Sequence, residues 1–590
     1  MSKPASDEGS SAEGMDNERI GNAFDEVADL LEFTGSNPFR VRAYRNASRT
    51  IRGLSQSLRD AVDRGDDLTQ MEGIGDDLAG KIIALARTGK LEMLEELRSK
   101  VPDGVMALLR IPGVGPKKAA LLFKELGIKS LDELRTACEQ GRVRELKGFG
   151  AKTEEGILKG IDVAAQANQR MFWSEADEIA QSLRRHMRGC PRIEQLEFAG
   201  SYRRGQETVG DLDMLVVSSE IATVMNQFAC YPGIAAVIGR GDTKMSVRLD
   251  SGLQIDLRVV PRESYGAALQ YFTGSKEHNV VVRGMAKQAG MKINEYGVFR
   301  VDGEQETYVA GASEAEVYAT LGLPLFPPEM REARQEFEWA RQGELPRLIE
   351  LSDLRGDLHM HTTATDGAAS IEQMIAAARK RGLEYIAITD HSQRVSMARG
   401  LDAQRVLAQW AEIDRIRREL DDDFVLLKGI ECDILEKGGM DLPDEVLAQA
   451  DWVLASVHYG QRQSRAEITE RILGALDNPY VTAIAHPTGR LLNQREPYEV
   501  DLEAVFRRAK ERGKILELNA NPHRLDLNDL HCAAARKLGI PIVISTDAHS
   551  VNGLDVMRYG ILQARRAGLT RDDVINTRPW PQLRKMLRNA

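Results

Sequence analysis

The sequence predicts a multidomain protein whose parts belong to the α+β and α/β classes, and three observations support this prediction. The chain has 590 residues, which is too long for one hydrophobic core and corresponds to about three to five domains. From Ile20 to about Ala165, apolar residues recur at helical spacing, which predicts helical domains. From Gly356 onward, short apolar strands alternate with helices, which predicts a parallel β/α barrel. The β-rich stretch between these parts, with one helix, predicts an α+β domain.

The composition is that of an ordinary soluble protein. Hydrophobic residues make up 42% of the chain and charged residues 28%, and no apolar run reaches the roughly 18–20 residues of a membrane span. Residues 1–17 lack the apolar core of a signal peptide. We therefore expect a cytoplasmic protein with no membrane partner. The scattered cysteines never form a C-x-x-C pair, which argues against a disulfide framework or a cysteine-bound zinc.

Charge is distributed unevenly along the chain. The net charge of −10 argues weakly against a nucleic-acid partner, because neutralising phosphates requires Lys and Arg. Arginines nevertheless crowd the stretch from Arg40 to Arg52 and recur at Arg203, Arg204, Arg248 and Arg258. Any binding to DNA is therefore expected to be regional and sensitive to salt.

Residues 1–17 form a tail rich in Ser, Glu, Gly and Asp, which is expected to be disordered. After this tail, one short pattern occurs three times. Each copy is a glycine, one apolar residue and a second glycine, followed by a helix-forming stretch. The glycines permit a tight turn, and the N-terminus of the following helix offers free N–H groups to a phosphate. The three pairs are Gly73 and Gly75, Gly113 and Gly115, and Gly148 and Gly150.

These copies resemble helix-hairpin-helix motifs, which bind the DNA backbone without reading its sequence. A single copy is equally consistent with a plain turn between two helices. Three copies in a row, with Lys117, Lys118 and Lys152 beside two of them, favour contact with DNA.

The clearest sign of catalysis lies in the middle of the chain, where two motifs are followed by a third acid: Gly200-Ser201-Tyr202-Arg203-Arg204, Gly210-Asp211-Leu212-Asp213 and Asp256. Because strand side chains alternate, Asp211 and Asp213 share one face, and Asp256 can join them from a neighbouring strand. Three carboxylates suit two divalent ions, Mg²⁺ or Mn²⁺, in nucleotidyl transfer, with Asp256 the best candidate to accept the 3′-hydroxyl proton. Ser201 and Arg204 would bind the triphosphate. For Asp-x-Asp alone, the alternative is a solvated strand edge.

These motifs resemble those of family X DNA polymerases, small repair enzymes with a nucleotidyltransferase palm. The resemblance continues in the segments Tyr271-Phe272-Thr273-Gly274-Ser275-Lys276-Glu277-His278-Asn279 and Ile293-Asn294-Glu295-Tyr296-Gly297. It implies that the Tyr271-Phe272-x-Gly274 turn contacts the sugar of the incoming nucleotide and opposes ribonucleotides. It further implies that Asn279 meets the base and that Arg283 lies on the template side. Taken alone, Tyr271 and Phe272 are better explained as core residues, but their place in this string of motif residues favours the nucleotide-binding role.

Lys81 is a further catalytic candidate, in Leu78-Ala79-Gly80-Lys81-Ile82. It stands where family members with 5′-deoxyribose-phosphate lyase activity carry their Schiff-base lysine, and Arg40 and Tyr44 fall where that site binds a 5′-phosphate. Such an amine reacts only when deprotonated, so burial or neighbouring cations must lower its pKa. Asp77, one helical turn earlier, favours the charged amine instead. The alternative is a solvated lysine near a 5′-phosphate pocket.

The C-terminal part carries a second candidate site. Six apolar runs predict barrel strands at 385–389, 425–430, 452–457, 481–485, 515–519 and 540–544. Residues of metal-binding type stand at or near strand ends, where such a barrel places its active site; they are His359, His361, Asp366, His391, Glu431, His458, His486, Asp547 and His549. Six of the ten histidines in the chain belong to this set, which random placement is unlikely to produce. Nine ligands exceed the needs of one ion, so two or three ions of Zn²⁺, Mn²⁺ or Fe²⁺ are implied.

This set resembles the ligands of the polymerase and histidinol phosphatase (PHP) domain, and all nine expected positions are filled. The resemblance favours Zn²⁺ or Mn²⁺. It implies three groups of ligands: His359, His361, Glu431 and Asp547 for one metal, Glu431, His458 and His486 for a second, and Asp366, His391 and His549 for a third. His523 and His531 have no motif around them, and we predict no functional role for either.

Together these parts resemble the bacterial polymerase X architecture from about Glu18 to the C-terminus. The implied segments are a tail at 1–17, a helical lyase-like domain at 18–98, a second helical domain at 99–169, the palm at 170–262, a small thumb-like nucleotide- and template-contacting subdomain at 263–325, a linker at 326–354 and a distorted β/α PHP barrel at 355–590.

The resemblance implies a DNA polymerase that fills short gaps in base excision repair. Its PHP domain would remove nucleotides or blocking groups from 3′ ends and cleave at abasic sites. Gapped or nicked DNA and dNTPs are the expected partners of a monomeric chain. The alternative is a DNA-binding scaffold with an idle palm, whose PHP domain hydrolyses a small phosphoester. Three mutually repelling carboxylates in the palm count against that alternative, because an idle palm has no physical reason to retain them.

Overall fold

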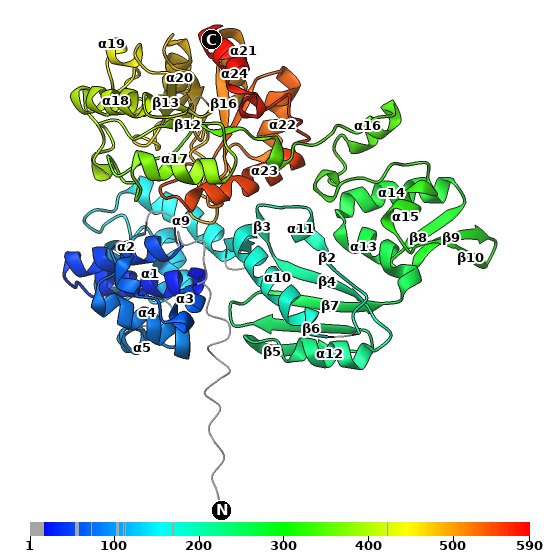
Figure 1. Cartoon of the computed structure of the whole chain (residues 1–590). Coiled ribbons are helices and arrows are strands. Elements are labelled where there is room, and N and C mark those ends of the chain that lie inside the picture. Colours follow the sequence, from blue (N-terminus) through cyan, green and yellow to red (C-terminus); the bar gives the residue numbers. More distant parts are fainter. Residues whose placement is uncertain are drawn as a thin grey trace, which may run out of the picture.

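The structure is a computed structural model, and it describes residues 17–52, 58–71, 73–101, 105–109, 111, 114–167, 170–190, 192–421 and 423–589. Residues 1–16 of the expected tail lie outside this described part. Figure 1 shows the helical domains in blue and cyan, the palm and thumb in teal and green, and the barrel in yellow-green to red above them. Among the described helices, none combines the length and the apolar character needed to cross a membrane.

The first domain is built from packed helices. Its described elements are α1 (Asn17–Phe33), α2 (Pro38–Arg52), α3 (Leu58–Arg64), η1 (Leu68–Gln70), α4 (Asp76–Thr88) and α5 (Glu92–Ser99). Apolar residues at helical spacing form one core, in which the rings of Phe24 and Tyr44 lie 5.5 Å apart. The predicted helical class is therefore confirmed for this part of the chain.

A second helical domain has its own core. It consists of α6 (Val105–Leu109), α7 (Pro116–Leu126), α8 (Leu131–Glu139) and α9 (Ala151–Ala167). Leu108, Leu122 and Leu134 are fully buried within it. Phe33 and Phe123, whose ring centroids are 6.0 Å apart, join it to the first domain.

The palm is a five-stranded sheet in the order β2-β4-β7-β6-β5. Its strands are β2 (Gln195–Phe198), β4 (Asp211–Val217), β5 (Ile234–Arg240), β6 (Lys244–Leu249) and β7 (Gln254–Val260), and a short pair joins β1 (Met171–Phe172) to β3 (Thr208–Val209). Helices α10 (Trp173–Arg188) and α12 (Ile221–Ala229) share one apolar core with the sheet. Between β2 and β4, the four-residue helix α11 (Gly200–Arg203) forms the Gly-Ser turn.

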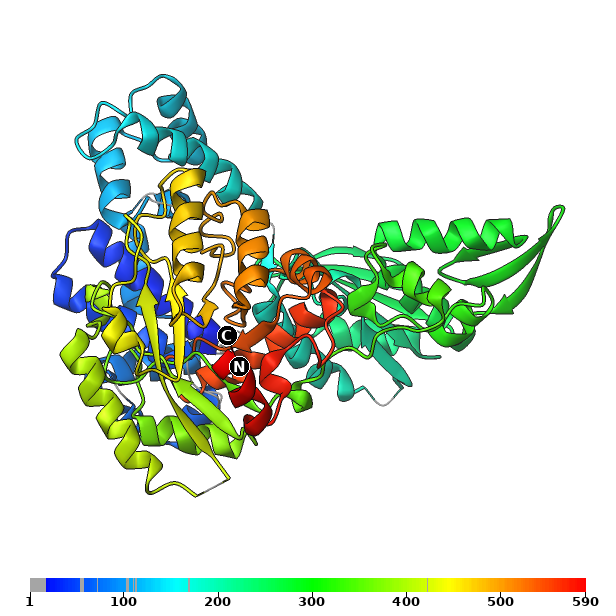
Figure 2. The same cartoon turned by 90° about the horizontal axis from the view of Figure 1, so that it is seen from above.

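The thumb-like subdomain follows the palm and projects away from the body of the molecule, as Figure 2 shows. It contains η2 (Arg262–Ser264), α13 (Tyr265–Thr273), α14 (Lys276–Gln288), the sheet of β8 (Met291–Asn294), β9 (Gly297–Asp302) and β10 (Gln305–Ala310), and α15 (Glu314–Ala319).

The expected linker at 326–354 is only partly a linker. Phe326 and Arg331 are fully buried and Glu336 is 1% exposed. Phe326 and the nearby Phe337 pack their rings on His278 of α14, so the first half of the segment completes the core of the thumb-like subdomain. The segment contains η3 (Pro328–Met330), α16 (Glu336–Gln342) and η4 (Leu351–Asp353).

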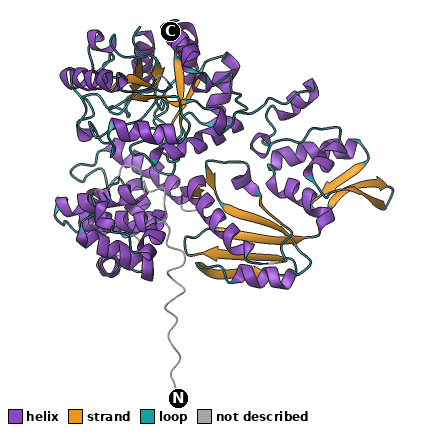
Figure 3. Cartoon of the chain, viewed as in Figure 1, coloured by secondary structure: helices purple, strands orange, loops and turns teal. Residues whose placement is uncertain are grey.

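The C-terminal domain is the predicted distorted barrel. Its seven strands run parallel in sequence order: β11 (Gly356–Asp357), β12 (Tyr385–Ile388), β13 (Val425–Asp433), β14 (Trp452–Ser456), β15 (Ala483–Ile484), β16 (Ile515–Asn519) and β17 (Ile542–Ser545). An isolated bridge between Met360 and Ala548 joins the β11 and β17 edges, so the barrel is nearly closed. The strands lie at the centre with helices around them (Figure 3), namely α17 (Ile371–Lys380), α18 (Ala403–Arg417), α19 (Asp444–Leu447), α20 (Arg465–Asp477), α21 (Leu502–Arg512), α22 (Asp529–Leu538), α23 (Met557–Arg566) and α24 (Trp580–Asn589).

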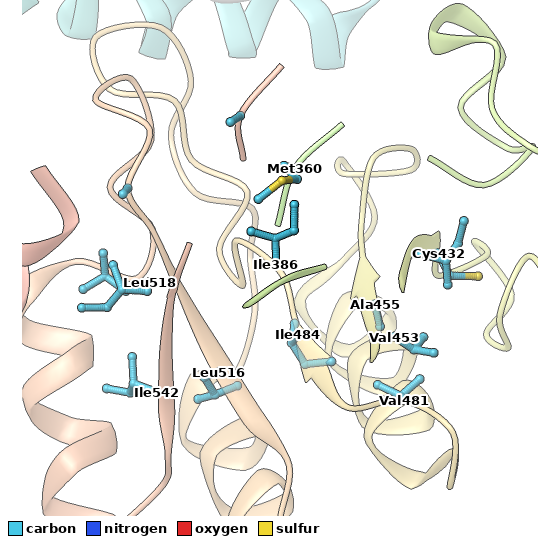
Figure 4. Close-up of a cluster of buried hydrophobic side chains, with 14 of the residues drawn as sticks. Met360, Ile386, Cys432, Val453, Ala455, Val481, Ile484, Leu516, Leu518 and Ile542 are labelled. Atoms are coloured by element: carbon cyan, nitrogen blue, oxygen red, sulfur yellow. The ribbon is translucent and has the colours of Figure 1, made fainter. Parts of the chain in front are cut away.

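Alternation along the strands separates two apolar layers of the barrel. Trp452 and Leu454 belong to an inner cluster that includes Leu583 of α24, whereas Val453 and Ala455 belong to the larger cluster shared with the surrounding helices. Figure 4 shows part of this larger cluster. Since both faces of every strand are covered, the strands read as continuous apolar runs, which is why the sequence predicted six of them.

Candidate active sites

The three palm acids converge on the edge of two adjacent parallel strands. Asp213 of β4 lies directly opposite Asp256 of β7 in the register, and Asp211 lies two residues before Asp213 on the same face. Asp256 is 7% exposed, whereas Asp211 is exposed. The three carboxylates therefore form one oxygen-rich group, and Asp211 exposes it to solvent.

The pKa values of these acids respond to burial and to one another. Burial, together with the charges of Asp211 and Asp256, raises the pKa of Asp213 to about 7. At Asp256, burial is outweighed by hydrogen bonds from Ser246, Lys244 and Gln254, so its pKa is lowered. A divalent cation fits this set, because it would relieve the repulsion that raises the Asp213 pKa.

The Gly-Ser turn lies against the acids. Gly200 adopts φ +66°, and a Cβ on it would lie 2.9 Å from Asp213 Oδ2, so the site requires glycine here. Arg204, predicted to bind triphosphate, donates from Nη1 to the main-chain oxygen of Thr273 at 2.5 Å and from Nε to Glu332 at 3.1 Å. Ser201 is partly exposed in the same turn, and Gly210 immediately precedes β4.

The Tyr-Phe-x-Gly turn lies against Arg204 of the Gly-Ser turn. The Tyr271 and Phe272 rings are 5.2 Å apart and partly exposed, and the Arg258 guanidinium lies 4.2 Å from the Phe272 ring. Gly274 adopts φ +67°, where a Cβ would lie 3.3 Å from Arg204 Nη1. The main chain can therefore approach that guanidinium closely only with glycine at this position.

Asn279 and Arg283 occupy different environments. Asn279 is 8% exposed, accepts a hydrogen bond from Gln270 at 2.7 Å and donates to the Tyr271 main-chain oxygen at 2.8 Å. In this structure its amide therefore stabilises the turn from behind. Arg283 is exposed on α14, where its Nε donates to the main-chain oxygen of Asn279 at 3.4 Å.

The nine predicted barrel ligands gather at the carboxyl ends of the strands. Three groups have ligand atoms within 4.8 Å of one another: His361, Asp366, His391 and His549; His359, His361 and Asp547; and His391, Glu431 and His458. His486 joins the third group, since its Nε2 lies 2.9 Å from Glu431 Oε1. His361 and His391 each bridge two groups, which the proposed division of ligands did not foresee.

Hydrogen bonding indicates that the cluster fits metal. Its members include buried ligand atoms that lack a hydrogen-bond partner, namely His359 Nε2, His361 Nδ1, Asp366 Oδ1 and Glu431 Oε2. Buried polar atoms without partners are costly unless another group satisfies them. His486 and Asp547 also adopt positive φ angles of 28° and 55°, a strained conformation typical of functional sites.

The charges of the cluster are strongly coupled. Burial alone would raise the pKa of Glu431, but the adjacent imidazoles hold it well below its usual range. Burial lowers the pKa of His391, but the carboxylates of Glu431 and Asp366 raise it. The net result is a pKa of about 10. Burial and the neighbouring His549 and His391 lower the pKa of His361 to about 4. Within the cluster, the positive charge of the imidazoles thus offsets the negative charge of the carboxylates.

The helix-hairpin-helix turns differ in charge. Gly75, Gly115 and Gly150 each directly precede a helix, and Gly73 and Gly148 have positive φ angles of 76° and 92°. The predicted Gly113 lies outside the described residues. Asp76 and Asp77 begin α4, whereas Lys117 and Lys118 lie in the first turn of α7 and Lys152 in that of α9. The second and third turns are therefore better suited to bind phosphate.

The environment of Lys81 differs from that of a reactive amine. Its Nζ forms an ion pair with Asp77, and hydrogen bonds to Asp77 and Tyr44 outweigh burial, so the Lys81 pKa is raised. Tyr44 is 1% exposed and donates to Met93 Sδ at 3.0 Å, so in this structure it is a core residue, and its contact with a phosphate stays a prediction. Arg40 is exposed on α2 and remains available to an anion.

Comparison with known families finds matches for the parts of the chain that carry both sites. Family models match residues 15–91 (helix-hairpin-helix domain), 105–162 (SAM-like helix-hairpin-helix tandem), 170–237 (DNA polymerase beta palm), 268–332 (DNA polymerase beta thumb) and 357–521 (PHP domain). The chain is also 42% identical over 565 residues to the DNA polymerase/3′-5′ exonuclease PolX of Bacillus subtilis strain 168, covering 95% of this chain and 97% of that protein. The chain belongs to the PolX family.

The barrel of this PolX-family chain also resembles free-standing proteins. A probable phosphatase of Thermoanaerobacter sp. strain X514 is 32% identical over 234 residues, covering 38% of this chain and 89% of that protein. A probable phosphatase of Acetivibrio thermocellus is 34% identical over 202 residues, covering 33% and 78%. A barrel of this kind therefore also occurs without polymerase domains.

Several residues that support the PolX-family sites were not foreseen from the sequence. Glu517 accepts from His359 Nδ1 at 2.7 Å and from the His486 main-chain N–H at 2.7 Å, so it orients two ligands at once. In the palm, Lys244 Nζ lies 3.0 Å from Asp256. Glu517 belongs to no sequence motif. It is, however, an acidic residue within the apolar predicted strand at 515–519, and that signal could have identified it.

Proposed function

We propose that this protein is a DNA polymerase that fills short gaps during repair and removes nucleotides or blocking groups from 3′ ends with its PHP domain. The observation that carries the proposal is the in-register pair of Asp213 and Asp256 beside the Gly200 turn, in a chain that also holds the barrel cluster. Gapped or nicked DNA and dNTPs are the proposed substrates, and a single chain supplies both sites. Because DNA is the proposed substrate, the protein would act in the compartment that holds the chromosome.

In the palm, the side chains have separate tasks. Asp211, Asp213 and Asp256 would hold Mg²⁺ or Mn²⁺, which supplies charge neutralisation for the attacking 3′-hydroxyl and the leaving pyrophosphate. Ser201 and Arg204 bind the triphosphate, and the Tyr271-Phe272 turn holds the sugar. Lys244 keeps Asp256 ionised, because its ammonium and hydrogen bond favour the charged carboxylate.

In the barrel, Zn²⁺ or Mn²⁺ would be held by the His and carboxylate groups described above, and when bound it supplies an activated water for phosphoester hydrolysis. Glu517 keeps His359 and His486 in a fixed orientation. We propose that this site carries the 3′-5′ exonuclease activity and also acts on 3′ blocks and abasic sites.

The likeness of the barrel to probable phosphatases favours a second candidate for this domain, hydrolysis of a small phosphoester. Primer extension on DNA with a one-nucleotide gap, with Mg²⁺ or Mn²⁺, distinguishes the two. A 3′-hydroxyl end should be extended directly, and a 3′-phosphate end should be extended only after a lag in which the phosphate is released. Failure to extend the first substrate would contradict the polymerase, and failure to release phosphate from the second would contradict the end-cleaning role.

A further inference from the structure

The palm turn that contains Arg204 touches the barrel domain directly. Gln563 of α23 donates from Nε2 to the main-chain oxygen of Gly205 at 2.9 Å. Gly205 has φ +65°, and a Cβ on it would lie 2.5 Å from Leu562 Cγ. The barrel helix therefore lies against the main chain of the turn, at a place where any side chain would push the two domains apart.

Arg566 extends this contact toward the guanidinium of Arg204. Its Nη1 donates to the main-chain oxygen of Arg204 at 2.7 Å and to Glu332 Oε1 at 2.9 Å. Its Nη2 lies 2.8 Å from Asp529 on the barrel side. The side chain of Arg566 is 1% exposed, so these charge-assisted bonds form out of water, where they are strongest.

Glu332 connects the two arginines. Its Oε1 accepts from Arg204 Nε at 3.1 Å and from Gln206 Nε2 at 2.7 Å, in addition to Arg566. With the Thr273 oxygen bound at Nη1, these contacts occupy two nitrogens of the Arg204 guanidinium. Nη2 is left, among the described contacts, as the nitrogen for a phosphate oxygen.

We infer that Arg566 and Glu332 are positioning residues for nucleotide binding, so that a helix of the PHP domain fixes the guanidinium that contacts the triphosphate. The inference rests on the proposed function of the palm. An arginine side chain loses rotamer entropy when it is immobilised. The network immobilises Arg204 before the nucleotide arrives, so that this cost does not reduce affinity for the nucleotide.

Kinetics of single-nucleotide gap filling by the full chain test the inference. Arg566→Met removes the bonds to Glu332 and to the Arg204 main chain while keeping side-chain length. It should raise the KM for dNTP about tenfold and leave kcat within about threefold. Arg204→Met should also raise KM, and the Arg204→Met/Arg566→Met double variant should be no worse than Arg204→Met, because the two residues act through one contact.

The matched control is Arg565→Met. Arg565 is the neighbouring residue on α23 and pairs with Glu329 at 2.8 Å, in the same segment as Glu332, but it has no described contact with Arg204. Its KM should equal that of the wild type. Hydrolysis of 3′ ends by every variant reports whether the barrel remains folded.

A second pair of variants tests the contact from the palm side. Gly205→Ala should raise KM as Arg566→Met does. Gly252→Ala, at a φ of +86° with nothing within 4 Å, imposes similar backbone strain without a clash and should not. Unchanged KM in both Arg566→Met and Gly205→Ala, with active wild type, overturns the inference alone. A wild-type chain that incorporates no nucleotide overturns the proposed function and this inference with it.

Discussion

The palm and the barrel both collect acidic side chains, but they balance the charge in different ways. In the palm, three carboxylates meet beside Lys244 and Arg258, and Asp211 exposes the group to solvent. In the barrel, six imidazoles surround three carboxylates, and His359, His361 and Glu431 are at most 1% exposed. In the palm, burial and the repulsion between carboxylates raise the Asp213 pKa, whereas in the barrel the imidazoles offset the charge of the carboxylates.

This difference indicates when each metal is acquired. A buried His and carboxylate cluster holds its ions as part of the folded domain. We expect the open palm to acquire its ions together with a nucleotide, whose phosphates bring further oxygen ligands, as is common for Mg²⁺ sites. We therefore expect the barrel metals to stabilise the fold as well as to serve catalysis, and the palm metals to serve catalysis alone.

The largest expected effect is the separation of the two activities by one palm acid. Asp256→Ala should lower nucleotide incorporation at least about a thousandfold, because it removes the acid that faces Asp213. Hydrolysis of single-stranded 3′ ends should stay within about twofold. Incorporation within tenfold of the wild type would remove Asp256 from its role.

The converse experiment replaces two barrel ligands. His359→Ala/His361→Ala should lower 3′-end hydrolysis at least about a hundredfold, since the ligands act as a unit through shared neighbours. Gap filling measured on the same preparation should be unchanged. A double variant that still removes 3′ nucleotides at the wild-type rate would contradict the assignment of hydrolysis to the barrel.

Metal removal should distinguish the two regions by stability. With metal at about 1,000 times its Kd, binding stabilises the barrel by about 4 kcal/mol, so chelation should lower its Tm by roughly 10 °C. The palm should unfold at the same temperature with or without chelator, and the histidine double variant should lose most of the shift. Equal shifts in wild type and double variant would show that the metals are not held by the cluster.

A smaller effect concerns how the palm joins the thumb-like subdomain. Burial opposes ionisation of Glu314, but Arg203 and Arg331 lower its pKa from 4.5 to about 2. Because the folded-state pKa is depressed, this stabilisation is present above about pH 4.5 and is lost as the pH falls toward 2. Glu314→Gln should cost about 3 kcal/mol at neutral pH.

Thermal unfolding of wild type and Glu314→Gln between pH 8 and pH 3 measures this contribution. The difference in stability should be constant down to about pH 5 and then shrink. A difference that already declines between pH 8 and pH 6 would identify a histidine, not Glu314, as the titrating group.

The smallest expected effect lies at Lys81. Its raised pKa disfavours the neutral amine that a Schiff base requires. Borohydride treatment with a 5′-deoxyribose-phosphate end should therefore trap no adduct above the level of Lys81→Ala. A covalent adduct that disappears in Lys81→Ala would contradict this and identify Lys81 as a lyase nucleophile.

The sequence alone determined the parts of the molecule whose signals are local. Period-two spacing predicted that Asp211 and Asp213 share a face, and apolar runs predicted six barrel strands because both of their faces are buried. The two-residue β11 was missed because it is too short to carry an apolar run. The edge strand β5 was missed although it begins with five apolar residues, and most of it is exposed. The residues of the candidate clusters were chosen by type and motif, and most of them meet in space.

Only the tertiary structure decided how distant residues act on one another. The burial of Tyr44, the packing of Phe326 and Arg331, the support of two histidines by Glu517 and the contact of Arg566 with Arg204 all depend on which elements meet. The partners in the last contact are separated by the entire thumb and most of the barrel in sequence, so no local pattern encodes it. The physical reason is that burial and charge pairing depend on distance in space, whereas propensity and periodicity act along the chain.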